Sequence, residues 1–325
     1  MAGQLWSTNT LGGYLYADEL SSVLRMEVRA STKFRQFCDA KDFADKGLNN
    51  GSTVTWNVYS KVATGGSTLT EGTAIAETNF TITQATATVV EWGNSVPFTS
   101  LTDMLGKHNV MDVTRNVLSR DCRETLDTEA EAKFRLTPLK YVATGAAAST
   151  GTLYTDGTAT GNNDVGLTKT HVRKISDLMK ERNIPAYEGD DYIAIARPTT
   201  FRDLKDELEQ VDQYTTTGYR KITNGEVGRF EAVRFVEQTQ ILSGGVNAAP
   251  ARDGTNNWTN GKSDWCYFMG ADTVAEVIAM APEIRGRIPS DYGRSMGMAW
   301  YALEGFGLVH SDATNARIVE WASAA

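Results

Sequence analysis

The segment between Asn109 and Pro138 is predicted to form one long amphipathic helix, because apolar residues recur there at a helical spacing. Asn109 is a suitable N-cap for this helix, and Pro138 marks its end. At roughly 1.5 Å per residue, such a helix is a rod about 40 Å long. We therefore expect it to be the spine on which two lobes of the chain pack, with its charged side facing solvent or another subunit. Its expected core residues are Met111, Leu118, Cys122, Leu126 and Phe134.

Two stretches before this helix are predicted to be the strands of a long hairpin. Residues 53–59 and residues 80–92 both alternate between bulky and Thr- or Ala-rich positions. The linker between them is small and polar, which favours a mobile end. An isolated two-stranded ribbon is marginal in water, so a neighbouring subunit is expected to cover its bulky side chains and to order it. These side chains are expected to share one face: Val54, Trp56, Phe80 and Ile82.

The rest of the chain mixes helices and strands without a repeated unit. A helix is predicted from about Tyr14 to Ala30, another from Thr168 to about Asn183, and a strand at residues 192–195 leads into a helix at residues 200–211. Further strands are predicted, including one at residues 229–236. Because there is no regular alternation of strand and helix, the expected fold class is α+β.

Composition and charge exclude several classes of protein. Hydrophobic residues make up 41% of the 325 residues, which is typical of a folded soluble chain, and no stretch is apolar enough for a membrane span. The three cysteines are far apart in sequence, so we expect buried thiols and no disulfide framework. The formal net charge is −8, whereas tight nucleic-acid binders carry clustered Lys and Arg.

The sequence contains no recognisable catalytic or cofactor motif. Its histidines, His108, His171 and His310, lack metal-ligand spacing, and there is no nucleophile elbow, phosphate loop or dinucleotide fingerprint. We therefore expect no enzyme activity, no cofactor and no metal. An α+β enzyme whose catalytic residues are scattered along the chain remains an alternative.

The order of these segments resembles the coat-protein family of tailed phages with the Hong Kong 97-type fold, most closely its N-four-like podovirus branch. The resemblance covers nearly the whole chain. It rests on the hairpin segments GSTVTWNVYSKV and LTEGTAIAETNFTITQATATVVEWGNSV and on the helix NVMDVTRNVLSRDCRETLDTEAEAKFR. It also rests on DYIAIARPTTFRDLKDEL, NGEVGRFEAVRFVEQT and MGMAWYALEGFGLVHSDATNARIVEW.

The resemblance implies a division of the chain and a set of subunit contacts. Its parts would be an N-terminal arm (1–50), an extended loop (51–95), a peripheral domain with the spine helix (96–185), an axial domain (186–280) and closing peripheral strands (281–325). The extended loop would lie over a neighbouring subunit. Its expected contact residues are Val54, Trp56, Val58, Lys61, Glu71, Phe80, Ile82 and Trp92.

The function implied by the resemblance is that of a structural virion protein. Copies of the chain would form pentamers and hexamers of an icosahedral head, assembled in the bacterial cytoplasm, that encloses double-stranded DNA without binding it strongly. A portal protein and a separate scaffolding protein would be its partners, and a decoration protein is a further candidate partner. The founding member crosslinks its subunits through a loop lysine; Lys61 is the only lysine in this loop, and no catalytic acid is identified. The alternative within the fold is an encapsulin-like compartment.

We predict from the net charge that the free subunit binds duplex DNA weakly. An acidic chain has little cationic excess with which to release counterions from phosphates, so the dissociation constant at physiological salt should be weaker than about 1 µM. Fluorescence anisotropy with a labelled duplex measures this directly. Sub-micromolar binding would contradict the prediction.

Overall fold

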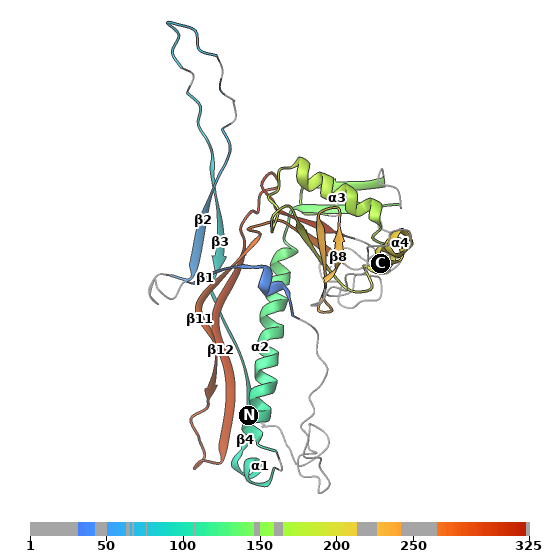
Figure 1. The fold of residues 1–325 in the computed structure, drawn as a ribbon. Coiled ribbons are helices and arrows are strands. Elements are labelled where there is room, and N and C mark those ends of the chain that lie inside the picture. The colour runs from blue at the N-terminus through green and yellow to red at the C-terminus, as the bar shows by residue number, and fades with distance from the viewer. Residues whose placement is uncertain are drawn as a thin grey trace.

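The computed structural model describes residues 32–42, 51–62, 66, 68–75, 77–106, 108–145, 150–158, 165–212, 226–241 and 265–322. These residues form an elongated body along one long helix, a second lobe at one end of that helix, and a hairpin that projects away from both (Figure 1). The helix predicted from Tyr14 to Ala30 lies outside the described residues. Within the described part, no helix has the length and apolar character needed to cross a bilayer.

The long helix is α2, Val110–Phe134, and its prediction from sequence is confirmed. The side chain of Asn109 accepts a hydrogen bond from the backbone N–H of Met111 at 3.0 Å, as expected of an N-cap. The buried face follows every fourth residue from one end to the other. Its members are Val110, Thr114, Leu118, Cys122, Leu126, Ala130 and Phe134.

Met111 is a correction to the predicted core, because its side chain is 42% exposed. Four residues of a helix turn by about 400°, so a stripe of every fourth residue winds around the helix by roughly 40° per step. Met111 lies seven residues before Leu118 and therefore on nearly the same side of the helix. The buried stripe winds away from that side, and in the first turn it passes through Val110. The same winding lets opposite ends of α2 face different sheets.

A four-stranded sheet lies along α2, in the order β1-β11-β12-β4. Its strands are β1 (Asp39–Asp42), β11 (Val274–Gly286), β12 (Ser295–Leu308) and β4 (Val90–Thr99). The strands β11, β12 and β4 are antiparallel neighbours, whereas β1 joins the edge of β11 in parallel. The short helix α1 (Ser100–Leu105) follows β4 directly.

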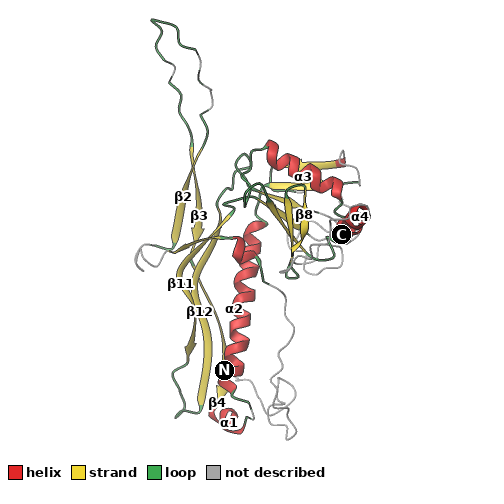
Figure 2. Ribbon diagram, viewed as in Figure 1, coloured by secondary structure: helices red, strands yellow, loops and turns green. Residues whose placement is uncertain are grey.

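A seven-stranded sheet forms the second lobe, in the order β6-β5-β13-β10-β7-β9-β8. One face packs on α2 in the first core cluster, and the other face packs on α3 (Lys169–Glu181) and α4 (Arg202–Asp212) in a second cluster (Figure 2). The strands β5, β6 and β13 come from outside the range 186–280 that the resemblance assigns to the axial domain. The strands are β5 (Leu139–Ala143), β6 (Gly151–Tyr154), β7 (Tyr192–Ala196), β8 (Glu226–Phe230), β9 (Val233–Glu237), β10 (Cys266–Met269) and β13 (Ile318–Trp321).

The single strand predicted at residues 229–236 is instead a hairpin of β8 and β9. Glu231 and Ala232 have φ angles of 50° and 61°, so the chain reverses between them. A two-residue hairpin turn of this hand usually carries Asn or Gly, and the absence of those residues hid the turn in the sequence. The hydroxyl of Ser176 on α3 donates a hydrogen bond of 2.9 Å to the carbonyl of Glu231, which holds the turn against the helix.

The projecting hairpin consists of β2 (Thr53–Tyr59) and β3 (Ile82–Thr88), which confirms the two-stranded ribbon. Its predicted face is wrong, however. Val54 pairs with Ala87 and Trp56 with Ala85, whereas Ile82 pairs with Tyr59. Directly opposed residues lie on the same face, so Phe80 and Ile82 belong to the face opposite Val54 and Trp56. A one-residue difference in register is enough to exchange the faces, and the alternation of each strand alone cannot fix it.

We predict that Leu126→Asp abolishes folding. Leu126 is fully buried at the middle of the α2 stripe, and an unpaired carboxylate there costs several kcal/mol, which is comparable to the stability of a whole domain. The matched control is Asn116→Asp, because Asn116 is exposed on the same helix. Thermal unfolding followed by circular dichroism should show a cooperative transition for the control and none for Leu126→Asp. A soluble, cooperatively melting Leu126→Asp protein would contradict the assignment.

Candidate subunit-contact surfaces and the arm junction

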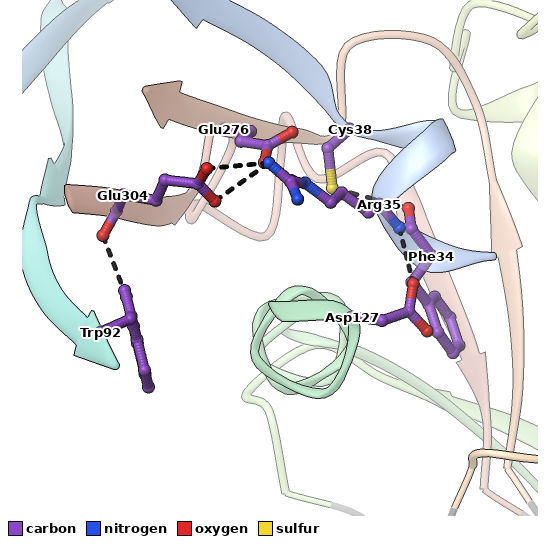
Figure 3. Close-up of polar contacts among 7 residues, drawn as sticks. All are labelled: Phe34, Arg35, Cys38, Trp92, Asp127, Glu276 and Glu304. Atoms are coloured by element: carbon purple, nitrogen blue, oxygen red, sulfur yellow. Dashed lines mark hydrogen bonds and ion pairs between the residues drawn. The ribbon is translucent and has the colours of Figure 1, made fainter. Parts of the chain in front are cut away.

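The segment Lys33–Asp42 joins the body at a junction built around Arg35 (Figure 3). Arg35 lies in a short 3-10 helix, η2 (Phe34–Phe37), that precedes β1. Its guanidinium bonds Glu276 of β11 at 2.5 Å and both carboxylate oxygens of Glu304 of β12 at 2.9 and 3.0 Å. Its backbone N–H donates to Asp127 of α2 at 3.0 Å. One residue of the arm therefore binds two strands and the spine helix.

Phe34 anchors the junction beside this polar network. Its side chain is buried, and its ring centroid lies 5.6 Å from the rings of both Phe134 and Tyr267. Phe134 belongs to α2 and Tyr267 to the seven-stranded sheet. The arm residue thus fills the space where the two meet, and aromatic contacts of this kind add to the free energy gained by burial.

The junction holds more negative charge than the arginine can neutralise. The side chain of Glu304 is 0% exposed, and burial raises its pKa to about 7, with Arg35 opposing the rise and Glu276 adding to it. Burial also raises the pKa of Glu276 and of Asp127, against the favourable contacts with Arg35 and, for Asp127, with the amide of Gln238. Two carboxyl groups, of Glu276 and Glu304, converge on the guanidinium, and a third, of Asp127, bonds the backbone N–H of the same residue. The charge of the junction therefore depends on pH near neutrality.

Sequence reasoning missed this junction. Arg35 is 241 residues from Glu276 and 269 residues from Glu304, so no local spacing connects them. The available signal was weak: Phe34 and Phe37 flank Arg35 in a charged segment. Glu304 is buried on the same side of β12 as Phe306. This burial can be recognised only when the position of β12 in the sheet is known.

A first exposed apolar surface lies along the hairpin, and we call it the hairpin surface. Tyr59 and Phe80 meet there with ring centroids 6.2 Å apart, and Ile82 is the cross-strand partner of Tyr59. Large apolar side chains that remain exposed mark interaction sites when they gather on one element. The hairpin surface consists of Tyr59, Leu69, Ile75, Phe80 and Ile82.

The predicted contact residues are distributed over different environments. Val54, Trp56 and Val58 are half-buried on the other face of the ribbon, and Lys61 and Glu71 are exposed. Trp92 lies in β4, where it packs against the first core and donates its indole N–H to the carbonyl of Glu304 at 3.1 Å. Of the predicted contact residues, Phe80 and Ile82 belong to the hairpin surface. Leu69, Ile75 and Tyr59 also belong to it, although they are not among the contact residues predicted from sequence.

A second exposed apolar surface lies at the opposite end of the body, around α1 and the turn between β11 and β12 (Figure 1). Its side chains are Leu101, Met104, Leu105, Ile288 and Tyr292. A molecule with exposed apolar groups at both ends of a long axis is suited to contact other copies through both ends.

Among the described residues, no group of three His, Cys, Asp or Glu side chains is arranged so that it could hold a metal ion. His171 is buried next to Trp321 and caps α3 through Thr168, with burial lowering its pKa. His310 bonds Asp272 at 3.3 Å. Cys122 and Cys266 are buried free thiols, and Cys38 is a free thiol at the junction.

We predict that stability falls as the pH rises from about 5 to about 8, and that Glu304→Gln flattens this dependence. A carboxyl group whose folded pKa is raised binds more protons in the native state, so its contribution is present below its ordinary pKa and is lost as the pH rises through about 7. The loss due to Glu304 amounts to at most about 3 kcal/mol. Urea unfolding at several pH values measures it, with exposed Glu283→Gln as the control. Equal slopes for wild type and Glu304→Gln would exclude this role.

Comparison with known proteins gives matches only at the level of structure. No family model and no curated protein sequence matches the chain. The capsid chain of cyanophage Pam1 has a TM-score of 0.69 at 18% identity, with 98% of this chain and 99% of that chain covered. The capsid of cyanophage P-SCSP1u gives 0.66 at 14% identity over 99% and 97%. The mature capsid of bacteriophage PhiM1 gives 0.65 at 13% identity over 99% and 96%.

These likenesses extend over nearly the whole length of both chains in each pair. The sequence identities are low, so the likenesses identify the fold, and the particular podovirus branch stays a prediction. The α+β class and the capsid-type architecture expected from the sequence are confirmed. The chain has the Hong Kong 97-like fold of phage capsid proteins.

Proposed function

We propose that this chain is the major capsid protein of a tailed phage, a non-enzymatic subunit that assembles into pentamers and hexamers of an icosahedral head. The observation that carries the proposal is the full-length likeness to three phage capsid chains, which includes the projecting hairpin as well as the two lobes. An enzyme would need neither a ribbon that leaves the body nor exposed apolar groups at its two ends.

The hairpin surface gives the proposal a physical basis. Among the described strands, β2 and β3 form backbone hydrogen bonds with each other alone, and a two-stranded ribbon is marginal in water. Tyr59, Phe80 and Ile82 remain exposed on the single subunit. A neighbouring subunit that covers them would supply the burial that the ribbon lacks, at roughly 25 cal/mol per Å² of apolar area removed from water.

The same proposal assigns a role to each part of the chain. The arm (1–50) and the hairpin would reach to neighbours, α2 with the four-stranded sheet would form the peripheral domain, and the seven-stranded sheet would form the axial domain. The head would enclose double-stranded DNA without strong binding, since the chain carries a net charge of −8. A scaffolding protein and a portal protein would take part in building the virion in the host cytoplasm, with a decoration protein as a further candidate partner.

Electron microscopy and size-exclusion chromatography of the purified full chain test the proposal. Shells, or capsomers of five or six copies, are the expected products, whereas a small globular oligomer would contradict it. Particles from infected cells should absorb more strongly at 260 than at 280 nm because they contain DNA. Protein-filled particles would instead indicate an encapsulin-like compartment.

We predict that the hairpin serves assembly and not folding. Replacing residues 63–78 by a tight Asn-Gly turn removes the reach of the ribbon but none of the core, so the subunit should fold with nearly unchanged thermal stability while closed shells fail to form. Gly66→Ala is the control, because open space surrounds Gly66. Shells of normal size from the shortened variant, or a variant that cannot fold, would refute this prediction.

A further inference from the structure

The hairpin leaves the body where its strand β3 crosses over β12. The last pair between β4 and β12 joins Val90 to Glu304, and the residues just before Val90 continue into β3. A methyl group on Gly305 would overlap the carbonyl oxygen of Thr88 and would lie 3.0 Å from the Cα of Val89. A methyl group on Gly307 would lie 2.7 Å from the Cβ of Ala87. The β3 backbone therefore passes over the face of Gly305 and Gly307.

This crossing lies on the side of β12 that faces away from α2. Side chains alternate between the two faces of a strand, and Phe306 packs in the first core beside α2, so Gly305 and Gly307 present the other face. Ala87 is 2% exposed in a strand that is otherwise largely exposed, because it is covered by this contact. Two glycines on β12 thus meet an alanine and the backbone of β3.

A second contact supports the root of the hairpin. Val58, Thr83 and Ala85 of the ribbon line a small cavity together with Val309 and His310, which follow β12. The ribbon is therefore held at two successive places along β12 and the loop after it. The rest of the hairpin extends beyond these supports (Figure 1).

We propose that Gly305 and Gly307 are positioning residues that set the angle at which the hairpin leaves the body, and so determine where the hairpin surface meets a neighbouring subunit. Only the contact with a neighbouring subunit rests on the proposed function. The angle itself is a property of the single chain.

A small change in the distance between β3 and β12 at the crossing produces a large displacement of the hairpin tip. Carbon atoms pack at roughly 3.5–4.0 Å, so a methyl group 2.7 Å from the Cβ of Ala87 requires the strands to separate by about 1 Å. Two residues of a strand span about 7 Å, and the 17 residues from Ala87 to Thr70 span at most about 55 Å. A separation of 1 Å at the crossing therefore tilts the ribbon by several degrees and moves its tip by about 8 Å.

The experiment measures this displacement in the free subunit. Spin labels are placed on the hairpin through Thr70→Cys and on α3 through Asp177→Cys, in a Cys38→Ser background, since Thr70 and Asp177 are exposed and the other two cysteines are buried. Pulsed electron resonance should show the mean distance shifted by about 5–10 Å in Gly307→Ala. Gly286→Ala, with open space around Gly286, should leave the distance unchanged.

A compensating variant separates the crossing from other effects of the substitution. Ala87→Gly removes the nearest atom that a new methyl group would meet, whereas the carbonyl oxygen of Thr86 at 2.9 Å remains, so Gly307→Ala combined with Ala87→Gly should recover part of the wild-type distance. If Gly307→Ala does not fold, Ala87→Ser enlarges the opposite side of the same contact and should shift the distance in its place. An unchanged distance between the two spin labels in Gly307→Ala would overturn the proposal. If Ala87→Ser is used in its place, an unchanged distance in that variant would do the same.

Assembly is scored separately on the same variants. Gly307→Ala should reduce the yield of closed shells at least tenfold or change their diameter, while Gly286→Ala gives normal shells. A shifted distance together with normal shells would overturn the link to assembly. Failure of the wild-type chain to assemble at all would count against the proposed function, while the distance measurement would still decide whether the crossing sets the angle.

Discussion

The apolar stripe of α2 packs against both sheets at once, and the remainder of the fold depends on that contact. The first core cluster joins Leu118, Leu126 and Phe134 of the helix to Trp300 and Phe306 of the four-stranded sheet. It also joins them to side chains of the seven-stranded sheet, among them Ile193, Ile195, Tyr267 and Met269. Because the stripe winds around the helix, one element supplies a surface to two sheets that face different directions. Polar contacts follow the same division, since Asp121 accepts a hydrogen bond from the indole of Trp300 and Glu131 accepts one from the hydroxyl of Tyr267.

Outside this core, the chain carries the projecting hairpin and the N-terminal segment Lys33–Asp42. Among the described residues of the hairpin, only Ala85 and Ala87 are buried, and the hairpin surface stays exposed. The arm is tied to the body through Phe34 and through Arg35, whose three carboxylate partners make the attachment sensitive to pH. The described fold thus combines a body stabilised by the packing of α2 with a hairpin most of whose described side chains are exposed.

The sequence predicts helices and strands well where the periodic spacing of apolar residues is long and uninterrupted. The stripe of α2 and the ribbon of β2 and β3 both follow from spacing alone. The errors arose where the answer depends on a relation between distant segments. A seven-residue spacing from Leu118 places Met111 in the core, whereas the buried row advances in steps of four residues and reaches Val110. The hairpin faces were exchanged because register is set by pairing, and the turn at Glu231 and Ala232 was missed because these residues seldom adopt positive φ. The junction of Arg35 with Glu276 and Glu304 spans most of the chain and leaves no local pattern.

Hydrogen exchange of the hairpin amides, compared between the free subunit and assembled shells, tests most directly whether neighbours complete this subunit. In an isolated two-stranded ribbon, alternate amides of Thr53–Tyr59 and Ile82–Thr88 point away from the partner strand, and little else opposes local opening. The account predicts that these amides exchange at least about 100-fold more slowly in shells, while the amides of α2 change little. Equal exchange of the hairpin in the two states would mean that no neighbouring subunit covers it, and would contradict the account.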